Sequence, residues 1–195
     1  MKRIFDIIVS SFILVCFLPF GILFSVLILF ESRGGVFYRQ VRIGKNNIPF
    51  KLFKFRSMNL NADKRGKLTV GKRDSRITRV GYFLRKYKLD EFPQFINVLI
   101  GHMSIVGPRP EVKEYVDLYN EEQLKVLNVK PGITDYASIE YFEENELLGR
   151  SENPQETYIN EVMPAKLELN KKYLVNPTIS HDLLIMWKTF LKIVQ

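Results

Sequence analysis

The sequence is poor in the residues that build disulfides and transition-metal sites. It contains one cysteine and two histidines among 195 residues. Cys16 lies inside an apolar segment and has no partner for an intrachain disulfide. A zinc site takes about four nitrogen or sulfur ligands, so we do not expect one. A metal bound by this chain would instead be a hard cation held by carboxylates and phosphates.

The chain also lacks internal repeats and low-complexity tracts, and its charge is unevenly distributed around a net of +8. Residues 31–90 contain 17 Lys/Arg and 4 Asp/Glu, a net of +13, whereas residues 111–161 contain 4 Lys/Arg and 13 Asp/Glu, a net of −9. The basic half predicts contact with phosphates, anionic lipid or nucleic acid. Ordinary solvated surface charge explains a single run equally well.

The N-terminal segment is a long hydrophobic run. From Ile7 to Phe30 the chain has 24 consecutive uncharged residues, more than the roughly 20 that span a bilayer. The run is too long for the roughly 7–15-residue core of a secretory signal, and no small-x-small cleavage site follows it. We therefore expect a membrane anchor at residues 1–32 and a water-facing domain at residues 33–195.

Two geometries fit this anchor. Pro19 lies in the middle of the run and removes a backbone donor, which predicts a kink or a break. Lys2 and Arg3 flank one end and Arg33 and Arg39 the other, so the positive-inside rule places both ends in the cytoplasm. A helix that breaks at Pro19 and returns to its starting face satisfies both ends. The residues alone leave a straight span and a re-entrant hairpin equally open.

Hydrophobic spacing in the remainder predicts an α/β domain that is mostly helical with a small mixed β element. We expect helices over residues 76–87, 92–100, 153–173 and from 181, strands within 34–40, 49–58 and 130–134, and a polar loop over 59–74. The helix at 76–87 and the last helix carry both apolar and basic residues. Each can lie as an amphipathic helix in the membrane interface or pack on the domain.

Asp90 and Glu91 fall at or just before the helix predicted to end at Gly101. Acidic residues commonly cap helices, and this is one interpretation of the pair. The same physics supports a functional interpretation. A helix dipole and upstream cations keep a carboxylate ionised, as a nucleophile or a metal ligand requires.

Basic residues in two further places are candidates for binding phosphate. Lys54 and Arg56 lie on the strand predicted at 49–58, where they form either a phosphate cradle or a solvated face. Arg109 lies between Pro108 and Pro110, after Gly107. Two prolines that fix the backbone around one guanidinium suit bidentate phosphate binding, although an ordinary proline turn has the same residues.

Taken in order, these strings resemble the bacterial sugar transferase family, the small monotopic phosphoglycosyl transferases that start glycoconjugate assembly. The strings are Lys2-Arg3-Ile4-Phe5-Asp6, Gln40-Val41-Arg42-Ile43-Gly44, Lys54-Phe55-Arg56-Ser57-Met58, Leu89-Asp90-Glu91-Phe92-Pro93-Gln94, Val106-Gly107-Pro108-Arg109-Pro110 and Lys130-Pro131-Gly132-Ile133-Thr134. The resemblance covers nearly the whole chain.

The resemblance implies transfer of a phosphosugar from a UDP-sugar to a polyprenol phosphate, typically undecaprenyl phosphate, with release of UMP. It implies that Asp90 attacks the β-phosphate and forms a covalent intermediate in a ping-pong reaction, that Glu91 assists, and that Mg2+ is held near the pair with Asp90 as its ligand. It places the enzyme on the cytoplasmic face of the bacterial inner membrane, in contact with membrane lipid.

The resemblance and the charge pattern together suggest which cations serve the substrate. A carboxylate cannot approach a pyrophosphate unless cations cancel the repulsion. We expect Arg109 to bind a substrate phosphate, and Lys54, Arg56 and Arg42 to contribute.

The chain departs from the family pattern in three places. Leu18 precedes Pro19 where many members have serine. Asp135-Tyr136-Ala137-Ser138 stands where many have Gly-Trp-Ala-Gln, and Asn170 occupies a commonly acidic position. These departures affect the expected sugar and nucleotide contacts rather than the acidic pair.

The resemblance favours the re-entrant hairpin, because the family's membrane helix breaks at a proline and emerges where it entered. It is compatible with a homodimer and does not fix the sugar, the pathway or the polyprenol length. An alternative from another class is a membrane-tethered basic module that binds anionic lipid or nucleic acid. That alternative leaves the acidic pair and the Gly-Pro-Arg-Pro turn unused. The chain also has no recognisable nucleic-acid motif, so we expect no nucleic-acid partner.

Overall fold

The computed structural model describes residues 1–62, 66, 68–71, 74–175 and 177–194. Its helices are α1 (Lys2–Glu31), α2 (Arg79–Lys86), α3 (Gln94–Leu99), α4 (Lys113–Val116), α5 (Glu121–Leu124), α6 (Tyr136–Glu140), α7 (Glu144–Gly149), α8 (Pro154–Thr157), α9 (Met163–Val175) and α10 (Ile179–Val194). Its strands are β1 (Phe37–Ile43), β2 (Pro49–Phe55), β3 (Ser104–Val106) and β4 (Gly132–Thr134). The predicted class is confirmed, and part of the predicted loop 59–74 lies outside the described residues.

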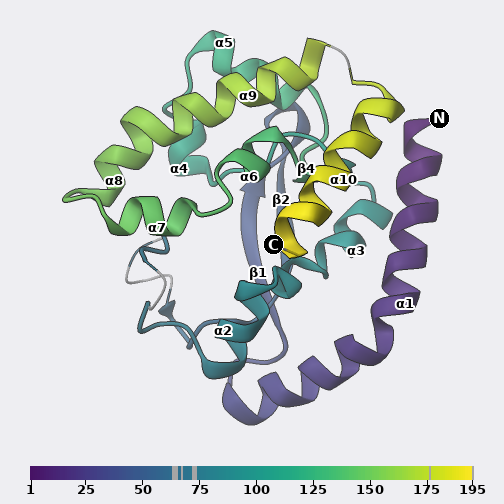
Figure 1. Cartoon of the computed structure of the whole chain (residues 1–195), viewed down its shortest axis with the longest axis vertical. Coiled ribbons are helices and arrows are strands. Elements are labelled where there is room, and N and C mark those ends of the chain that lie inside the picture. Colours follow the sequence, from purple (N-terminus) through teal and green to yellow (C-terminus); the bar gives the residue numbers. More distant parts are fainter. Residues whose placement is uncertain (63–65, 67, 72–73, 176, 195) are drawn as a thin grey trace.

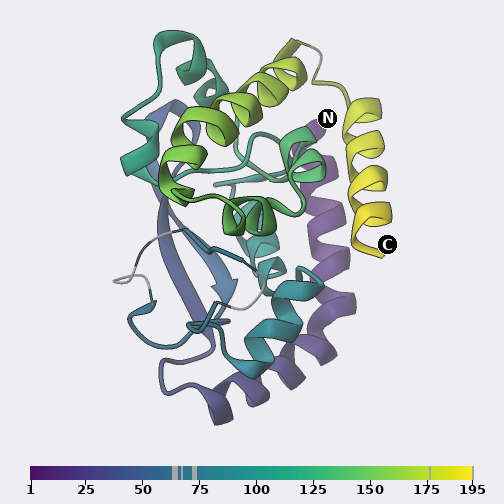
Figure 2. The ribbon, with the colours of Figure 1, turned by 60° about the vertical axis from the view of Figure 1, so that its left-hand side comes forward.

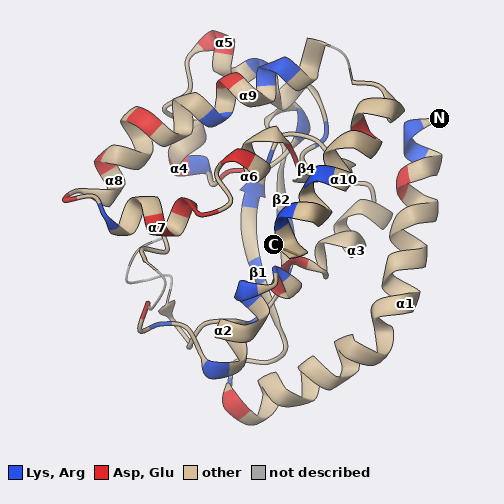
Figure 3. Cartoon of the chain, viewed as in Figure 1, with Lys and Arg blue, Asp and Glu red and all other residues tan. Residues whose placement is uncertain are grey.

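α1 is a helix of 30 residues that changes direction partway along its length (Figure 1). Pro19 lies inside it and accounts for the bend, because proline removes one backbone hydrogen bond and crowds the preceding turn. The predicted kink is present, and the helix continues through it. Within the described residues, α1 is the one helix long and apolar enough to cross a membrane. Most of its apolar side chains are exposed, and its charges lie near its two ends (Figure 3).

The charged first turns of α1 dock on the domain. Lys2 forms an ion pair with Asp182 of α10. Arg3 donates a hydrogen bond of 2.8 Å to the carbonyl of Leu99, at the C-terminal end of α3, where a helix dipole favours a cation. Asp6 is 3% exposed and accepts hydrogen bonds from β3. The basic residues that we read as flanking charges of the anchor therefore also hold it to the domain.

The other end of α1 contacts the same domain. The Glu31 carboxylate accepts hydrogen bonds from the backbone N–H groups of Arg79 at 2.7 Å and Val80 at 2.8 Å. These N–H groups belong to the first turn of α2 and have no partner within that helix. Phe24 and Ile28 are buried against β2 and α2. Both ends of the bent helix thus lie against one domain, as Figure 2 shows from a second side.

Two small sheets form the centre of the domain. β1 and β2 make an antiparallel hairpin that pairs Phe37 with Phe55, while β3 and β4 pair in parallel. Asn97 of α3 is fully buried and holds β2 in place. Its side chain accepts a hydrogen bond of 2.9 Å from the Phe53 N–H and donates one of 2.8 Å to the Lys51 carbonyl. This contact fixes β2 beside the turn that precedes α3.

The C-terminal third covers one side of the sheets. Asn153 caps α8, which has Pro154 in its first turn, and a π-helical turn over Tyr158–Val162 leads into α9 within the helix predicted over 153–173. α10 follows and lies beside the N-terminal half of α1 (Figures 1 and 2). The exposed apolar side chains of α10 are Leu183, Leu184, Trp187, Phe190, Leu191 and Val194. α1 and α10 therefore both leave apolar surface uncovered by the domain.

Candidate active site

The acidic pair lies on a short turn between two helices. α2 ends, Lys88 adopts a left-handed conformation with φ of 55°, and a 3₁₀ turn over Leu89–Glu91 follows. α3 then begins at Gln94, so the predicted position just before a helix is confirmed. Asp90 is 5% exposed, and the Glu91 side chain is 12% exposed.

The Glu91 carboxylate is fully engaged by two cations. Lys54 Nζ lies 3.0 Å from Glu91 Oε1, and Arg109 Nη1 lies 3.1 Å from Oε2 while its Nη2 donates to Oε1. Burial by itself raises the pKa of Glu91, but Arg109 and Lys54 outweigh burial and hold that pKa well below its usual range. Glu91 in turn raises the pKa of Arg109. This carboxylate is therefore ionised and has both oxygens occupied.

The Asp90 carboxylate is bare by comparison, because it accepts no hydrogen bond from any residue that the structure describes. Burial raises the pKa of Asp90, and Lys54 opposes this only in part. The neighbouring charge of Glu91 adds to the rise. The sequence argument that nearby cations keep a carboxylate ionised thus applies to Glu91, whereas burial outweighs the cations at Asp90. Asp90 is nevertheless the member of the pair whose oxygens accept no hydrogen bond within the described part of the chain.

Lys54 reaches the pair because of its place in the strand alternation. Phe50, Leu52 and Lys54 lie on one face of β2, and the first two side chains are buried in the core. The Lys54 side chain is 19% exposed, and burial lowers its pKa although Glu91 opposes the shift. Lys51 is exposed on the other face. A solvated strand face therefore accounts for the lysine at position 51. It does not account for the lysine at position 54, whose side chain is largely buried.

Arg56 has a different environment from Lys54. Its guanidinium donates hydrogen bonds to the backbone carbonyls of Gly35 at 2.9 Å and Phe37 at 3.3 Å, which brace the start of β1. It lines a second cavity of about 160 Å³ that also reaches Asp90. The structure gives Arg56 no direct contact with the acidic pair, and its predicted role in binding phosphate stays a prediction.

The Arg109 turn is locked in place by a second turn. The Gly107 N–H donates to the Thr134 carbonyl at 3.1 Å, and the Gly132 N–H donates to the Pro108 carbonyl at 3.0 Å. A Cβ on Gly132 would lie 2.1 Å from the Gly107 nitrogen, so glycine is required at this crossing. The Arg109 N–H also donates to Asp135 at 2.9 Å. The Gly-Pro-Arg-Pro turn and the segment that contains Gly132 therefore act together to aim Arg109 at Glu91.

Arg42 belongs to a neighbouring cluster. It forms an ion pair of 2.6 Å with Glu111, whose carboxylate also accepts a hydrogen bond of 2.5 Å from the Tyr158 hydroxyl. Burial raises the pKa of Glu111, but Arg42 and Lys166 outweigh it and lower that pKa. Sequence reasoning missed Glu111 and Tyr158. The one available signal was that Glu111 directly follows the Gly-Pro-Arg-Pro turn.

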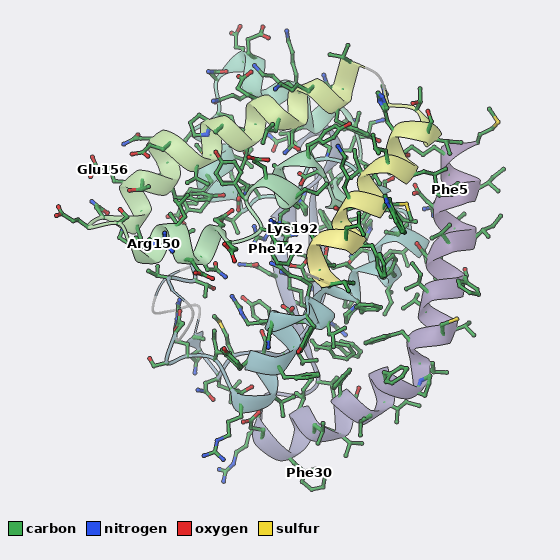
Figure 4. All side chains as sticks on the ribbon, viewed as in Figure 1. Phe5, Phe30, Phe142, Arg150, Glu156 and Lys192 are labelled. Atoms are coloured by element: carbon green, nitrogen blue, oxygen red, sulfur yellow. The ribbon has the colours of Figure 1, made fainter. Side chains whose placement is uncertain are left out.

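The acidic pair, Lys54, Arg109 and the Arg42–Glu111 cluster line one cavity of about 530 Å³. Its charged wall includes Arg42, Lys54, Lys88, Asp90, Glu91 and Arg109. Its apolar wall includes Ile13 of α1, Phe95 of α3, and Met186, Phe190 and Ile193 of α10. Arg85, which donates to Thr69 at 2.9 Å, also lines the cavity and was missed from sequence, as was Lys88. Figure 4 shows the side chains, with Phe142 and Lys192 labelled near the centre of the view.

The fold and the geometry define an α/β protein with an N-terminal helix long and apolar enough to cross a membrane, and with two carboxylates among cations in one cavity. The chain belongs to the bacterial sugar transferase family, whose model matches residues 1–195. The family resemblance seen in the sequence motifs is thereby confirmed.

Three relatives illustrate the similarity. UDP-N-acetylgalactosamine-undecaprenyl-phosphate N-acetylgalactosaminephosphotransferase of Aeromonas hydrophila is 36% identical over 192 residues, which are 97% of this chain and 42% of the relative. UDP-glucose:undecaprenyl-phosphate glucose-1-phosphate transferase of Klebsiella pneumoniae is 39% identical over 194 residues, 98% of this chain and 39% of the relative. Exopolysaccharide production protein ExoY of Rhizobium meliloti (strain 1021) is 33% identical over 203 residues, 96% of this chain and 83% of the relative. This chain spans about two fifths of the length of the first two relatives.

Proposed function

We propose that this protein transfers a phosphosugar from a UDP-sugar to a polyprenol phosphate, typically undecaprenyl phosphate, and releases UMP. The observation that carries the proposal is the two-sided cavity. Its charged wall surrounds Asp90 and suits a diphosphate, while its apolar wall is built from the exposed helices α1 and α10 and suits a lipid. Two relatives of this chain, those of Aeromonas hydrophila and Klebsiella pneumoniae, are named for UDP-sugars and undecaprenyl phosphate.

Asp90 is the nucleophile in this proposal. Its carboxylate oxygen forms a bond to the β-phosphorus of the UDP-sugar, the bond from that phosphorus to the bridging oxygen breaks, and UMP leaves with the electron pair. A phosphate oxygen of the lipid then attacks the same phosphorus and releases Asp90. The bare carboxylate of Asp90 supports this choice, since both oxygens of Glu91 are bound by cations.

Glu91 assists by holding Lys54 and Arg109 at the reacting centre. Each cation is fixed between Glu91 and its own backbone element, so positive charge is in place before the diphosphate arrives. Preorganised charge of this kind stabilises a phosphoryl-transfer transition state without reorganisation during the reaction. Arg42 contributes from the adjoining Glu111 cluster. Arg56 has the weakest structural support among the four predicted cations.

The residues present fit Mg2+ as a cofactor held largely by its substrate. The described part of the chain has no group of three or more Asp, Glu, His or Cys that could hold a metal. Mg2+ commonly uses one or two carboxylates together with substrate phosphates, and the bare carboxylate of Asp90 is such a donor. When bound there, the ion supplies positive charge to the diphosphate.

The anchor is proposed to be a bent, re-entrant helix over residues 1–32, with the catalytic domain over residues 33–195 on the cytoplasmic face of the bacterial inner membrane. Its support is that Lys2 and Glu31, near opposite ends of α1, both contact the domain. Exposed apolar side chains on α2 and α10, including Tyr82, Phe83 and Trp187, fit amphipathic helices in the interface. The binding-module alternative leaves the cavity without a role.

The test is a UMP-release assay with Mg2+, undecaprenyl phosphate and a panel of UDP-sugars. The wild-type protein should release UMP with at least one donor, and Asp90→Asn should release none. Parallel double-reciprocal lines are expected for a ping-pong reaction. Full activity of Asp90→Asn would refute the nucleophile, and lines that intersect would refute the covalent route. Salt-sensitive nucleic-acid binding with no turnover of any donor would favour the binding module.

A further inference from the structure

Lys88 stands out among the cations of the cavity. The others that the structure describes have polar partners: Arg42 with Glu111, Lys54 and Arg109 with Glu91, Lys166 with Glu144, and Arg85 with Thr69. Lys88 has neither an ion pair nor a side-chain hydrogen bond to a described residue. Its ammonium lies 5.0 Å from the centroid of the Phe142 ring. Among the described residues, no carboxylate therefore forms an ion pair with Lys88.

The backbone at Lys88 adds a second observation. Its φ of 55° is in the left-handed region, which glycine or asparagine adopts more readily than lysine. Its carbonyl accepts the Glu91 N–H at 3.2 Å, so this strained residue shapes the turn that carries the acidic pair. The turn needs the conformation, but it has no need of a long cationic side chain. The presence of lysine here points to a role for the ammonium group.

The position of the side chain indicates what it binds. Lys88 lines the same cavity as Asp90, two residues further along the chain, and its charge favours the ionised forms of both Asp90 and Glu91. A contact between an ammonium and a phenylalanine ring is weak compared with a charged hydrogen bond to phosphate. The ammonium can therefore exchange the ring of Phe142 for a phosphate oxygen.

We propose that Lys88 is a further catalytic residue, which binds the phosphate that leaves with UMP. The proposal rests on the proposed function. When the Asp90 oxygen bonds to the β-phosphorus, the bridging bond breaks and its electron pair leaves on the α-phosphate of UMP. Lys54 and Arg109 are tied to Glu91 and stay with the phosphosugar. Lys88 has a flexible side chain with no ion pair among the described residues, and it can follow the departing phosphate and neutralise the charge developing on it.

Lys88→Gly is the informative variant. Glycine accepts the left-handed backbone, so the melting temperature should stay within about 2 °C of wild type while the ammonium is lost. We expect kcat/KM for UMP release to fall about 10- to 100-fold, the range for loss of one charged hydrogen bond, with kcat falling as well. The dissociation constant of UMP, measured by calorimetry with Mg2+, should rise by a similar factor. Lys88→Arg should recover part of both.

Lys86→Met is the matched control. Lys86 is the last residue of α2, two positions before Lys88. Its ammonium also lies over an aromatic ring, 5.2 Å from the centroid of Tyr87, but it is exposed and does not line the cavity. It should behave as wild type in both assays. The proposal is overturned if Lys88→Gly matches Lys86→Met, or if turnover falls while UMP affinity is unchanged. If Lys88→Gly has no effect while the wild-type protein releases UMP, the Lys88 proposal fails and the proposed function stands. If the wild-type protein releases no UMP from any donor, the proposed function itself fails.

Discussion

The acidic pair predicts opposite effects on stability for two isosteric substitutions. Asp90→Asn should abolish turnover and leave the protein at least as stable as wild type at pH 7. Burial raises the pKa of Asp90, which means that the folded state disfavours the charged carboxylate. Asparagine removes that cost, and no hydrogen bond to a described residue is lost with the charge. Loss of activity in this variant therefore cannot be attributed to unfolding.

Glu91→Gln should destabilise the protein, because it leaves Lys54 and Arg109 without their counter-charge. Removing one partner of a buried ion pair costs about 3–5 kcal/mol. The Lys54 and Arg109 side chains are 19% and 31% exposed, so solvent screens part of this cost. We expect about 2–3 kcal/mol after that discount. For a chain of this size the corresponding fall in melting temperature is about 4–12 °C.

The assay is thermal unfolding of the detergent-solubilised protein, followed by circular dichroism, together with UMP release from the same samples. The pH dependence gives a second check. A carboxyl whose pKa is raised in the folded state destabilises the protein above that pKa, and this effect disappears as pH falls below 3.8, the pKa of a free aspartate. The difference between Asp90→Asn and wild type should therefore shrink in acid. The reasoning fails if Asp90→Asn melts several degrees below wild type. It also fails if Glu91→Gln melts at the same temperature as wild type.

Three further predictions concern the same elements. The acid limb of kcat/KM should lie above pH 3.8, because a buried Asp90 is ionised less readily than a free aspartate; a limb at or below that value would contradict the burial of the nucleophile. Arg109→Lys should lose more than about tenfold in kcat/KM, since an ammonium cannot reproduce the two-point contact, and equal rates would show that charge alone suffices. Thiol-reactive labels on single cysteines at residues 2 and 33, in a background without the native cysteine, should report the same membrane side; opposite sides would establish a straight span despite Pro19.

Local signals in the sequence were sufficient to locate the acidic pair and the Arg109 turn. The apolar spacing from Phe92 to Gly101 predicts a helix, and a helix start immediately after Asp90 and Glu91 follows from it. Proline on either side of Arg109 restricts its backbone without reference to the rest of the fold. These features depend on residues within one or two turns of each other, where rules of spacing apply.

Pairings over long sequence separations could not be predicted from the same rules. Arg109 reaches Glu91 across 18 positions, and Tyr158 reaches Glu111 across 47. The alternation in β2 shows where Lys54 points, but it does not show that α3 packs against that face. Which carboxylate is bound and which is bare therefore depends on tertiary contacts that local patterns do not encode.

The N-terminal charges illustrate the same limit for the anchor. Lys2 and Arg3 fit the positive-inside rule, and the sequence offers no sign that Lys2 also pairs with Asp182, 180 positions away. The structure changes the argument for a bent anchor. Flanking charge is a statistical preference, whereas two docked ends impose a geometric condition: a helix whose first and last turns both bind one domain has to turn back on itself or lie along that domain.

The arrangement around Glu91 also resolves a conflict in the chemistry. In the proposed reaction the site needs several cations to neutralise a diphosphate, but if all of them lacked counter-charge they would also hold the product UMP. Glu91 neutralises about one of the two charges on Lys54 and Arg109 and fixes both in position. Under the proposed function, these two cations would polarise the phosphates without holding them permanently. The cations would then stabilise the transition state, where the phosphate charge changes most, more than the bound substrate. Such a difference raises kcat rather than only lowering KM. Asp90 has no such partner among the described residues, so its oxygen is available for the proposed attack.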